Sequence, residues 1–243
     1  QPLHQLTLDR HIFGTVLRTS RKGLSSGVWG GRYEYYKACL EDETSFEALC
    51  DVAEHLARAR VPRCITDALR VSALTAISKP DNRVRGIAAA DALRRLVAKA
   101  LAKQFQEPLR TAVRPHNFGL SNRSGTDAAI HLLQYLVEAH PNKIILSVDG
   151  VGAYDHISRA RMFEHLLQDR ALHGLIPFVK QWYGVQSEFR WVDDASTSHV
   201  IFQGDGGEQG DALMPGLFCL ALHPALEQIR ARPVSYTHLT LPT

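Results

Sequence analysis

Cysteine is scarce in this chain, and its four cysteines form no C-x-x-C pair. Structural zinc sites commonly draw their ligands from such pairs, so the spacing argues against zinc. We expect Cys39, Cys50, Cys64 and Cys219 to be small buried side chains of a protein in a reducing compartment. The twelve histidines show no H-E-x-x-H or H-x-H spacing, which leaves them as ordinary surface and core residues.

Long apolar runs are also missing. No run reaches the length of a membrane span, and no signal peptide opens the chain. We therefore expect an intracellular protein of the nucleus or cytoplasm, with no membrane partner. The net charge of +3 is too small to indicate nucleic acid by itself. The chain begins with Gln1 rather than Met, so we expect it to be part of a longer protein.

The most informative stretch is 144–155, which reads I-I-L-S-V-D-G-V-G-A-Y-D. A short apolar run ends in Asp149, and a glycine-containing turn leads to Tyr154 and Asp155. The run predicts a buried strand that presents the Asp149 carboxylate at its carboxyl end. A loop acid fixed by a strand is a common way to provide an oxygen ligand for a metal ion.

Helical periodicity is clear in several segments. A helix capped by the T-S-F-E box at 44–47 is expected to bury Phe46, Leu49, Val52, Ala53 and Leu56. Later helices are expected at 92–105, at 126–137, after Ser158, near Pro177 and from about 213 to 230. The 126–137 helix should turn four apolar residues inward, namely Ile130, Leu133, Leu136 and Val137.

The helix at 92–105 carries cations at Arg94, Arg95, Lys99 and Lys103, opposite an apolar face. These cations are expected to form a solvated surface, and the alternative is contact with phosphates.

Two hairpins are expected. The first joins 69–77 through the turn residues Pro-Asp-Asn to a segment that includes Arg85, with a cationic tip. The second joins 187–192 to 199–203, because Phe189 and Trp191 alternate with polar residues.

Several short motifs, taken together and in order, resemble the reverse transcriptase domain of non-LTR, LINE-like retrotransposons. They are Lys79 with V-R-G-I at 84–87, Phe118-Gly119, V-D-x-x-x-A-Y-D at 148–155, and E-Q-G-D-A-L-M-P-G-L-F at 208–218. The resemblance spans about residues 20–230. The glycine-rich segment 204–210 matches neither common phosphate-binding loop, so a simple nucleotide-binding loop is disfavoured.

The resemblance implies a role for each matched residue. Asp149 would be a catalytic metal ligand in a reaction that uses two magnesium ions. Tyr154 would exclude ribonucleotides as a steric gate, whereas Asp155 would be mainly structural. Lys79 and Arg85 would hold the incoming triphosphate, and Gln209 and Gly210 would pack against the nucleotide and the template base. The implied partners are an RNA template, a DNA primer and deoxynucleoside triphosphates.

The sequence departs from the family pattern at three positions. Gly86 stands where proline is usual after Arg85, which suggests a looser loop there. Ala212 and Met214 replace a proline and a small residue, which puts detailed nucleotide positioning in doubt. The family's aromatic-x-Asp-Asp motif does not follow the Gln209 segment. We therefore expect this chain alone to be inactive, since one aspartate cannot hold two metal ions.

The segment W-V-D-D at 191–194 has the local form of the missing motif. It precedes the Gln209 segment rather than following it, so we interpret it as an exposed acidic turn.

The expected fold class is α/β (α+β), a right-hand polymerase fragment with fingers and a partial palm but no thumb. The palm would be an antiparallel sheet with packed helices. We divide the chain into a loop-rich segment at 1–31, a fingers-like region at 32–142 and a partial palm at 143–233. Residues 234–243 resemble translated adaptor sequence and form a non-native tail.

Two other interpretations stay open. One is a catalytically dead, nucleic-acid-binding remnant of a retroelement. The other is a related polymerase of the group II intron or telomerase type, although A-Y-D at 153–155 and L-A-L-H-P at 220–224 favour the retrotransposon branch.

Overall fold

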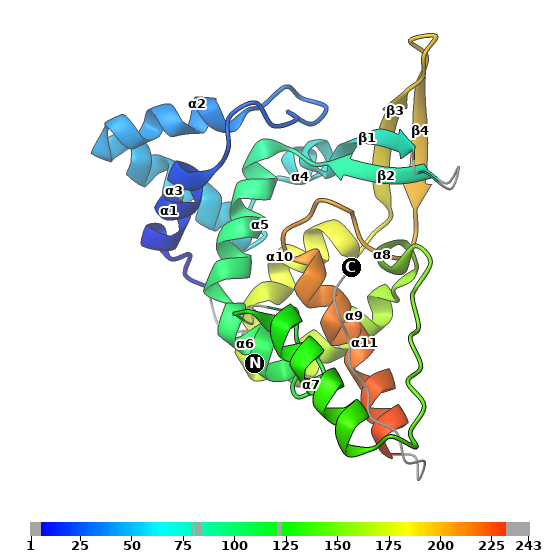
Figure 1. Cartoon of the computed structure of the whole chain (residues 1–243). Coiled ribbons are helices and arrows are strands. Elements are labelled where there is room, and N and C mark those ends of the chain that lie inside the picture. Colours follow the sequence, from blue (N-terminus) through cyan, green and yellow to red (C-terminus); the bar gives the residue numbers. More distant parts are fainter. Residues whose placement is uncertain (1–5, 79, 81–83, 121–122, 232–243) are drawn as a thin grey trace.

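The computed structural model describes residues 6–78, 80, 84–120 and 123–231. In this part of the chain, one four-stranded sheet lies at the upper right of Figure 1, and the helices lie beside and below it. The mixed α/β class is therefore confirmed. No helix in the described ranges is long and apolar enough to cross a membrane.

Both expected hairpins form and join in one sheet. β1 (Val71–Ser78) pairs antiparallel with β2 (Val84–Ala89), and β3 (Ser187–Val192) pairs antiparallel with β4 (Ser198–Gln203). β1 and β3 run parallel, however, so the strand order β2-β1-β3-β4 makes a mixed sheet. The expectation of an antiparallel sheet is wrong here. The long helical connection between β1 and β3 permits parallel pairing, which a short hairpin does not.

The first half of the chain supplies helices on one side of the sheet. α5 runs through the middle of this group, and α1 and α3 pack against it. The segment expected to be loop-rich contains α1, which begins where the Asp9 carboxylate accepts a hydrogen bond from the Ile12 amide. The elements are α1 (Arg10–Thr19), α2 (Tyr33–Lys37), η1 (Ala38–Glu41), α3 (Glu43–Ala57), α4 (Arg63–Arg70), α5 (Ala92–Gln104) and α6 (Gln106–Ala112).

The second half builds the rest of the core. α9 and α10 pack together, and α11 lies against α9 and α6. Phe178 and Trp182 of α10 are fully buried and meet edge to face. The elements are α7 (Gly125–Ala139), α8 (Ala153–His156), α9 (Arg159–Gln168), η2 (Arg170–Leu175), α10 (Ile176–Tyr183) and α11 (Met214–Ala231).

Local signals placed most helix starts correctly. Ser158 caps α9 by accepting a hydrogen bond from the Arg161 amide, and Pro177 lies in the first turn of α10. α3 starts slightly earlier than expected, because Asp42 rather than Thr44 caps it. Val52 of α3 is half exposed, which corrects its expected burial.

The largest difference from the sequence expectation is at 144–149. This apolar run forms no strand, and Ile144, Leu146 and Val148 are each more than four-fifths exposed. In Figure 1 the segment runs along the edge of the molecule from α7 to α8. An apolar run becomes a buried strand only beside a partner strand, and no described strand pairs with it.

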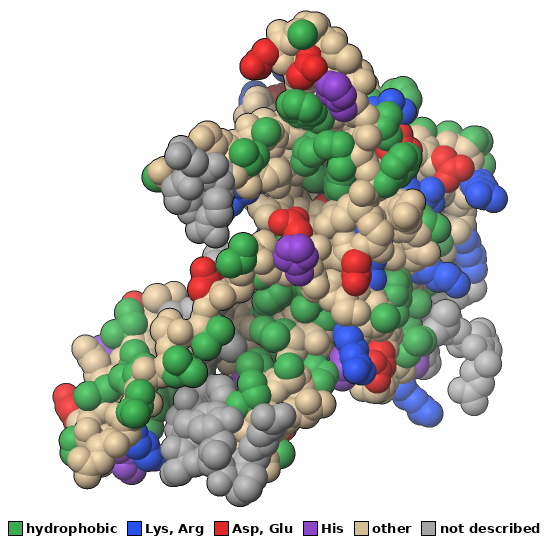
Figure 2. All heavy atoms as spheres, turned by 90° about the vertical axis from the view of Figure 1, so that its right-hand side faces the viewer, with side chains coloured by type: hydrophobic (Ala, Val, Ile, Leu, Met, Phe, Trp, Pro, Cys, Tyr) green, Lys and Arg blue, Asp and Glu red, His purple; other side chains and the backbone are tan. Residues whose placement is uncertain are grey.

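Other apolar positions are also more exposed than expected. Ile130 and Val137 of α7 lie at the surface. Cys64 is exposed, whereas Cys50 and Cys219 are buried. Figure 2 shows many hydrophobic side chains on the face at the right of Figure 1.

Candidate functional site

Three segments that are distant in sequence meet at the turn 208–211. The carbonyl oxygen of Gln209 accepts a 3.0 Å hydrogen bond from the Ala88 amide of β2. The Gly207 amide donates to the Tyr154 carbonyl at 2.7 Å. The Gln209 side-chain amide lies 3.5 Å from the Asp155 carboxylate. The structure therefore brings the end of β2, the strand that carries Arg85, together with the segments around Tyr154 and Gln209.

The turn has a geometry that requires glycine at one position. The Asp211 amide donates to the Glu208 carbonyl at 3.1 Å, which places Gln209 and Gly210 at the two central positions. Gly210 has a φ of +123°, and a Cβ there would lie 2.6 Å from the Ala88 carbonyl oxygen. Only glycine fits this close approach to β2 without strain.

Met214 packs directly under the loop. Its side chain is fully buried, and a Cβ built at Gly207 would lie 1.7 Å from the Met214 sulfur. The large residue at 214 is therefore matched by the absence of a side chain at 207. The family pattern, which has a small residue at this position, did not predict this packing.

Arg159 holds the first part of the loop. Its guanidinium donates to the Gly206 and Val185 carbonyls and to the Ser187 hydroxyl, at 2.6 to 2.8 Å. Its backbone amide donates to the Asp205 carboxylate at 2.7 Å. Burial lowers the pKa of Arg159 from its ordinary value. These contacts join α9 to the loop and to β3.

Arg94 forms a buried ion pair with Glu208, which corrects its expected place on a solvated face. The Arg94 Nη2 atom lies 2.9 Å from Glu208 Oε1, and the two side chains are 2% and 1% exposed. The Ser72 hydroxyl donates to the other Glu208 oxygen at 3.0 Å. Burial alone would lower the pKa of Arg94, but the nearby carboxylate of Glu208 raises it overall.

A second carboxylate anchors the far end of the turn. Asp211 accepts a hydrogen bond from the Tyr183 hydroxyl at 2.7 Å and another from the Leu213 amide at 2.9 Å. Loss of solvent raises the pKa of Asp211, and burial raises the pKa of Tyr183 well above its ordinary value. Sequence reasoning did not assign Arg94, Glu208 or Tyr183 to the site.

Tyr154 lies at the start of α8, close to this turn. Its ring meets the Phe218 ring edge to face, with centroids 5.2 Å apart. The side chain is half-buried, and burial raises its pKa. The contact with Phe218 holds one edge of the Tyr154 ring in place. Both a core aromatic residue and a steric gate need a ring held in this way.

The expected triphosphate ligands lie on the first hairpin. Arg85 is exposed on β2, opposite Ile77 of β1. Lys79 lies outside the described residues. Gly86 is not in a loop, as the sequence suggested, but in β2 opposite Ala76. The backbone beside Arg85 is therefore held by strand pairing.

Asp149 lies in the exposed segment between α7 and α8. The described residues include no group of three His, Cys, Asp or Glu side chains that could hold a metal ion. The role of Asp149 as a metal ligand stays a prediction.

The W-V-D-D segment forms the tip of the β3–β4 hairpin. Asp193 accepts hydrogen bonds from the Thr197 amide and the His199 ring, each at 2.8 Å. These bonds lower the pKa of Asp193. Asp194 is exposed. The interpretation as an acidic turn is confirmed.

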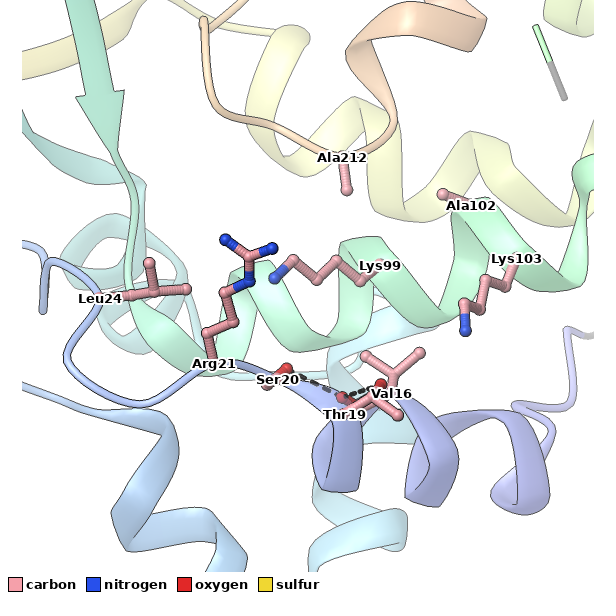
Figure 3. Close-up of a pocket in the computed structure, with 9 residues that line it drawn as sticks. All are labelled: Val16, Thr19, Ser20, Arg21, Leu24, Lys99, Ala102, Lys103 and Ala212. Atoms are coloured by element: carbon pink, nitrogen blue, oxygen red, sulfur yellow. Dashed lines mark hydrogen bonds between the residues drawn. The ribbon is translucent and has the colours of Figure 1, made fainter. Parts of the chain in front are cut away.

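A shallow groove of about 380 Å³ lies beside the loop, between α1 and α5. Its lining includes Arg21, Lys99, Lys103 and Ala212, and the charged ends of Arg21 and Lys99 lie close together (Figure 3). Burial and the neighbouring Arg95 lower the pKa of Lys99. Like charges gathered in a groove favour an anionic ligand.

Neither the comparison with models of known protein families nor that with curated proteins finds a match.

Proposed function

We propose that this chain is a region of an RNA-directed DNA polymerase of the non-LTR retrotransposon type. The observation that carries the proposal is that the Tyr154 and Gln209 segments and β2, the strand that carries Arg85, meet at one turn. These segments were singled out by sequence motifs alone, and more than 120 positions separate the first from the last. Motifs that serve one ligand are expected to converge in space.

The proposed ligand is a deoxynucleoside triphosphate. Arg85 and Lys79 supply the positive charge for its phosphates, since guanidinium groups suit bidentate phosphate contacts. Gln209 and Gly210 present an amide side chain and an exposed glycine on a fixed turn, against which a base or sugar packs. Tyr154 acts as the steric gate against a 2′-hydroxyl group. In this proposal β1 and β2 belong to the fingers-like region, and β3, β4, α8, α9 and α11 belong to the partial palm.

The groove between α1 and α5 supports nucleic acid as the second partner. Arg21, Lys99 and Lys103 line it, and among the described residues none of these three forms an ion pair. A phosphate backbone would neutralise them and release counterions. The proposed partners are thus an RNA template and a DNA primer. Magnesium would supply charge stabilisation in the complete enzyme, with Asp149 as one ligand.

The first experiment measures nucleotide binding by this chain with an RNA template and a DNA primer. We expect it to bind a deoxynucleoside triphosphate more tightly than the ribonucleotide. Arg85→Ala should weaken both by about tenfold, the loss expected for one charge-assisted contact. Tyr154→Ala should remove the preference for the deoxy sugar. Arg63→Ala is the matched control, because the Arg63 side chain is 94% exposed on α4, outside the proposed site.

Equal loss of binding in Arg85→Ala and Arg63→Ala would show that the contact is only general electrostatics. The same template and primer then serve a primer-extension assay on a longer protein that includes this region. We expect extension there, and none in Asp149→Ala. Extension that survives in Asp149→Ala would remove Asp149 from the catalytic site.

A second candidate function is a nucleic-acid-binding remnant without catalysis. The basic groove favours it. It predicts salt-dependent RNA binding with no nucleotide preference at all. Loss of RNA binding in Lys99→Gln/Lys103→Gln, with no deoxynucleotide binding in the unmodified chain, would favour this function over the first.

A further inference from the structure

The turn that presents Gln209 and Gly210 is anchored from beneath by carboxylates at both ends. Glu208 precedes the pair and Asp211 follows it, and the hydrogen bonds of both carboxylates lead into the protein. Gln209 itself stays partly exposed. Two acids at the ends of a surface turn would ordinarily point to water, so their inward orientation requires an explanation.

The position of Glu208 is set by groups from separate elements. Arg94 comes from α5 and Ser72 from β1, and each contacts a different carboxylate oxygen. The Arg94 guanidinium also lies over the Trp182 ring of α10, 4.6 Å from its centroid. The Glu208 side chain therefore has one available position, defined by the packed core rather than by the loop.

The loop cannot define that position by itself. Glycines at 204, 206, 207 and 210 give its backbone wide conformational freedom. Besides the backbone bond that its carbonyl accepts from Ala88, Gln209 makes only one long side-chain contact, 3.5 Å to Asp155. Whatever fixes the adjacent Glu208 side chain therefore limits where Gln209 can lie.

We propose that Arg94 and Glu208 are positioning residues, whose buried ion pair holds the 208–211 turn and thereby places Gln209. The nucleotide that Gln209 would contact rests on the proposed function, whereas the ordering of the turn does not. A buried ion pair commonly adds little net stability compared with an apolar pair of the same size. Its retention here is explained by the single geometry that it imposes on a glycine-rich loop.

Amide hydrogen exchange of the 204–211 segment, compared with that of α9 and α10, tests the proposal. Glu208→Gln removes the charge, and we expect exchange in the segment to rise by about tenfold or more. Ser72→Ala keeps the ion pair and removes one hydrogen bond, for an expected rise of about fivefold. Thr66→Ala is the matched control, since its buried hydroxyl donates only to the Pro62 carbonyl at the start of α4.

A rise in 204–211 that exceeds the rise in α9 and α10, which reports the loss of global stability, supports positioning. A rise of the same size in α9 and α10 means that the pair acts only through global stability and overturns the proposal, as does an unchanged segment. If Glu208→Gln fails to fold, Ser72→Ala decides by the same criterion.

Binding of a deoxynucleoside triphosphate provides the second readout. We expect affinity to fall in Ser72→Ala but not in Thr66→Ala. Tight binding that is equal in all variants overturns the positioning role. No binding in the unmodified chain, together with the expected exchange pattern, defeats the proposed function and leaves the positioning of the turn established.

Discussion

Arg94 of α5 and Glu208 of the loop before α11 meet at 2.9 Å, with almost no exposure of either side chain. The two residues are 114 positions apart, and their contact joins the first half of the chain to the loop that carries Gln209. Breaking such a pair leaves one charge buried without a partner. Removing either partner of the Arg94–Glu208 pair should therefore lower the free energy of unfolding.

Arg94→Met and Glu208→Gln should each destabilise the protein by about 3–5 kcal/mol, because each leaves an uncompensated buried charge or polar group. The double variant should recover most of this loss, since neither charge then remains. Urea unfolding measures both effects. The control is Arg161→Met, which breaks an ion pair with Glu164 that is 60% and 45% exposed and should cost less than about 1 kcal/mol. Additive losses in the double variant would contradict the pairing.

The helical spacing of the sequence indicates that Arg94 is buried. Arg94 precedes Val97, Ala98 and Leu101 by three, four and seven positions, which places it on their buried stripe. Because arginine is charged, Arg94 was instead expected on the solvated face of the helix. The partner at Glu208 could not be predicted, because contacts across so many residues depend on tertiary packing.

The expected hairpins and the Ser158 cap formed because their signals are local, whereas α3 is capped by Asp42 rather than by the expected Thr44. Turn residues, alternation and the Ser158 cap act within a few positions. The run 144–149 differs, since a strand needs hydrogen-bond partners from elsewhere in the chain. Of the site, motifs identified Gln209 and Tyr154, and the structure places their segments together. The inward carboxylates around Gln209 were not predictable from any local pattern.

Gly207→Ala should destabilise the protein by about 1–3 kcal/mol, because the new methyl group meets the buried Met214 side chain. Met214→Ala removes this obstacle, so the double variant should lose less than the sum of the two single changes by about 1 kcal/mol. Thermal unfolding of the variants provides the comparison. Gly204→Ala is the control in the same loop, where the nearest atom is 3.7 Å from a built Cβ. If the losses of the two single variants simply add, the Met214 side chain moves away from the new methyl group without a cost in free energy.

Stability should fall at mildly acidic pH through His223 of α11. Burial lowers the pKa of His223 below its ordinary value of 6.5, and His116 and His165 add to this effect while Glu227 opposes it. The unfolded chain therefore takes up a proton first as pH falls below 6.5, which favours unfolding. Stability is retained above that pH and declines below it, towards the folded-state pKa.

Urea midpoints measured between about pH 5 and pH 8, the range in which histidine titrates, give the size of this effect. His223→Asn should flatten the decline, whatever it does to stability at neutral pH. His11→Asn, at an exposed position on α1, should leave the decline unchanged. Equal slopes in the unmodified protein and in His223→Asn would assign the pH dependence to other groups.

The segment at 144–149 is exposed in the structure, whereas the sequence predicts a buried strand there. A substitution at Leu146 tests which of the two is right. Leu146 is 83% exposed, so Leu146→Glu should change the free energy of unfolding by less than about 0.5 kcal/mol. It should also reduce self-association, which light scattering measures, because it places a charge in an exposed apolar run. Leu166→Glu is the control for a buried leucine, fully enclosed in α9, and should prevent folding. If Leu146→Glu lost as much stability as Leu166→Glu, Leu146 would have to be buried. That result would support the buried strand that the sequence predicts, with the Asp149 carboxylate at its end.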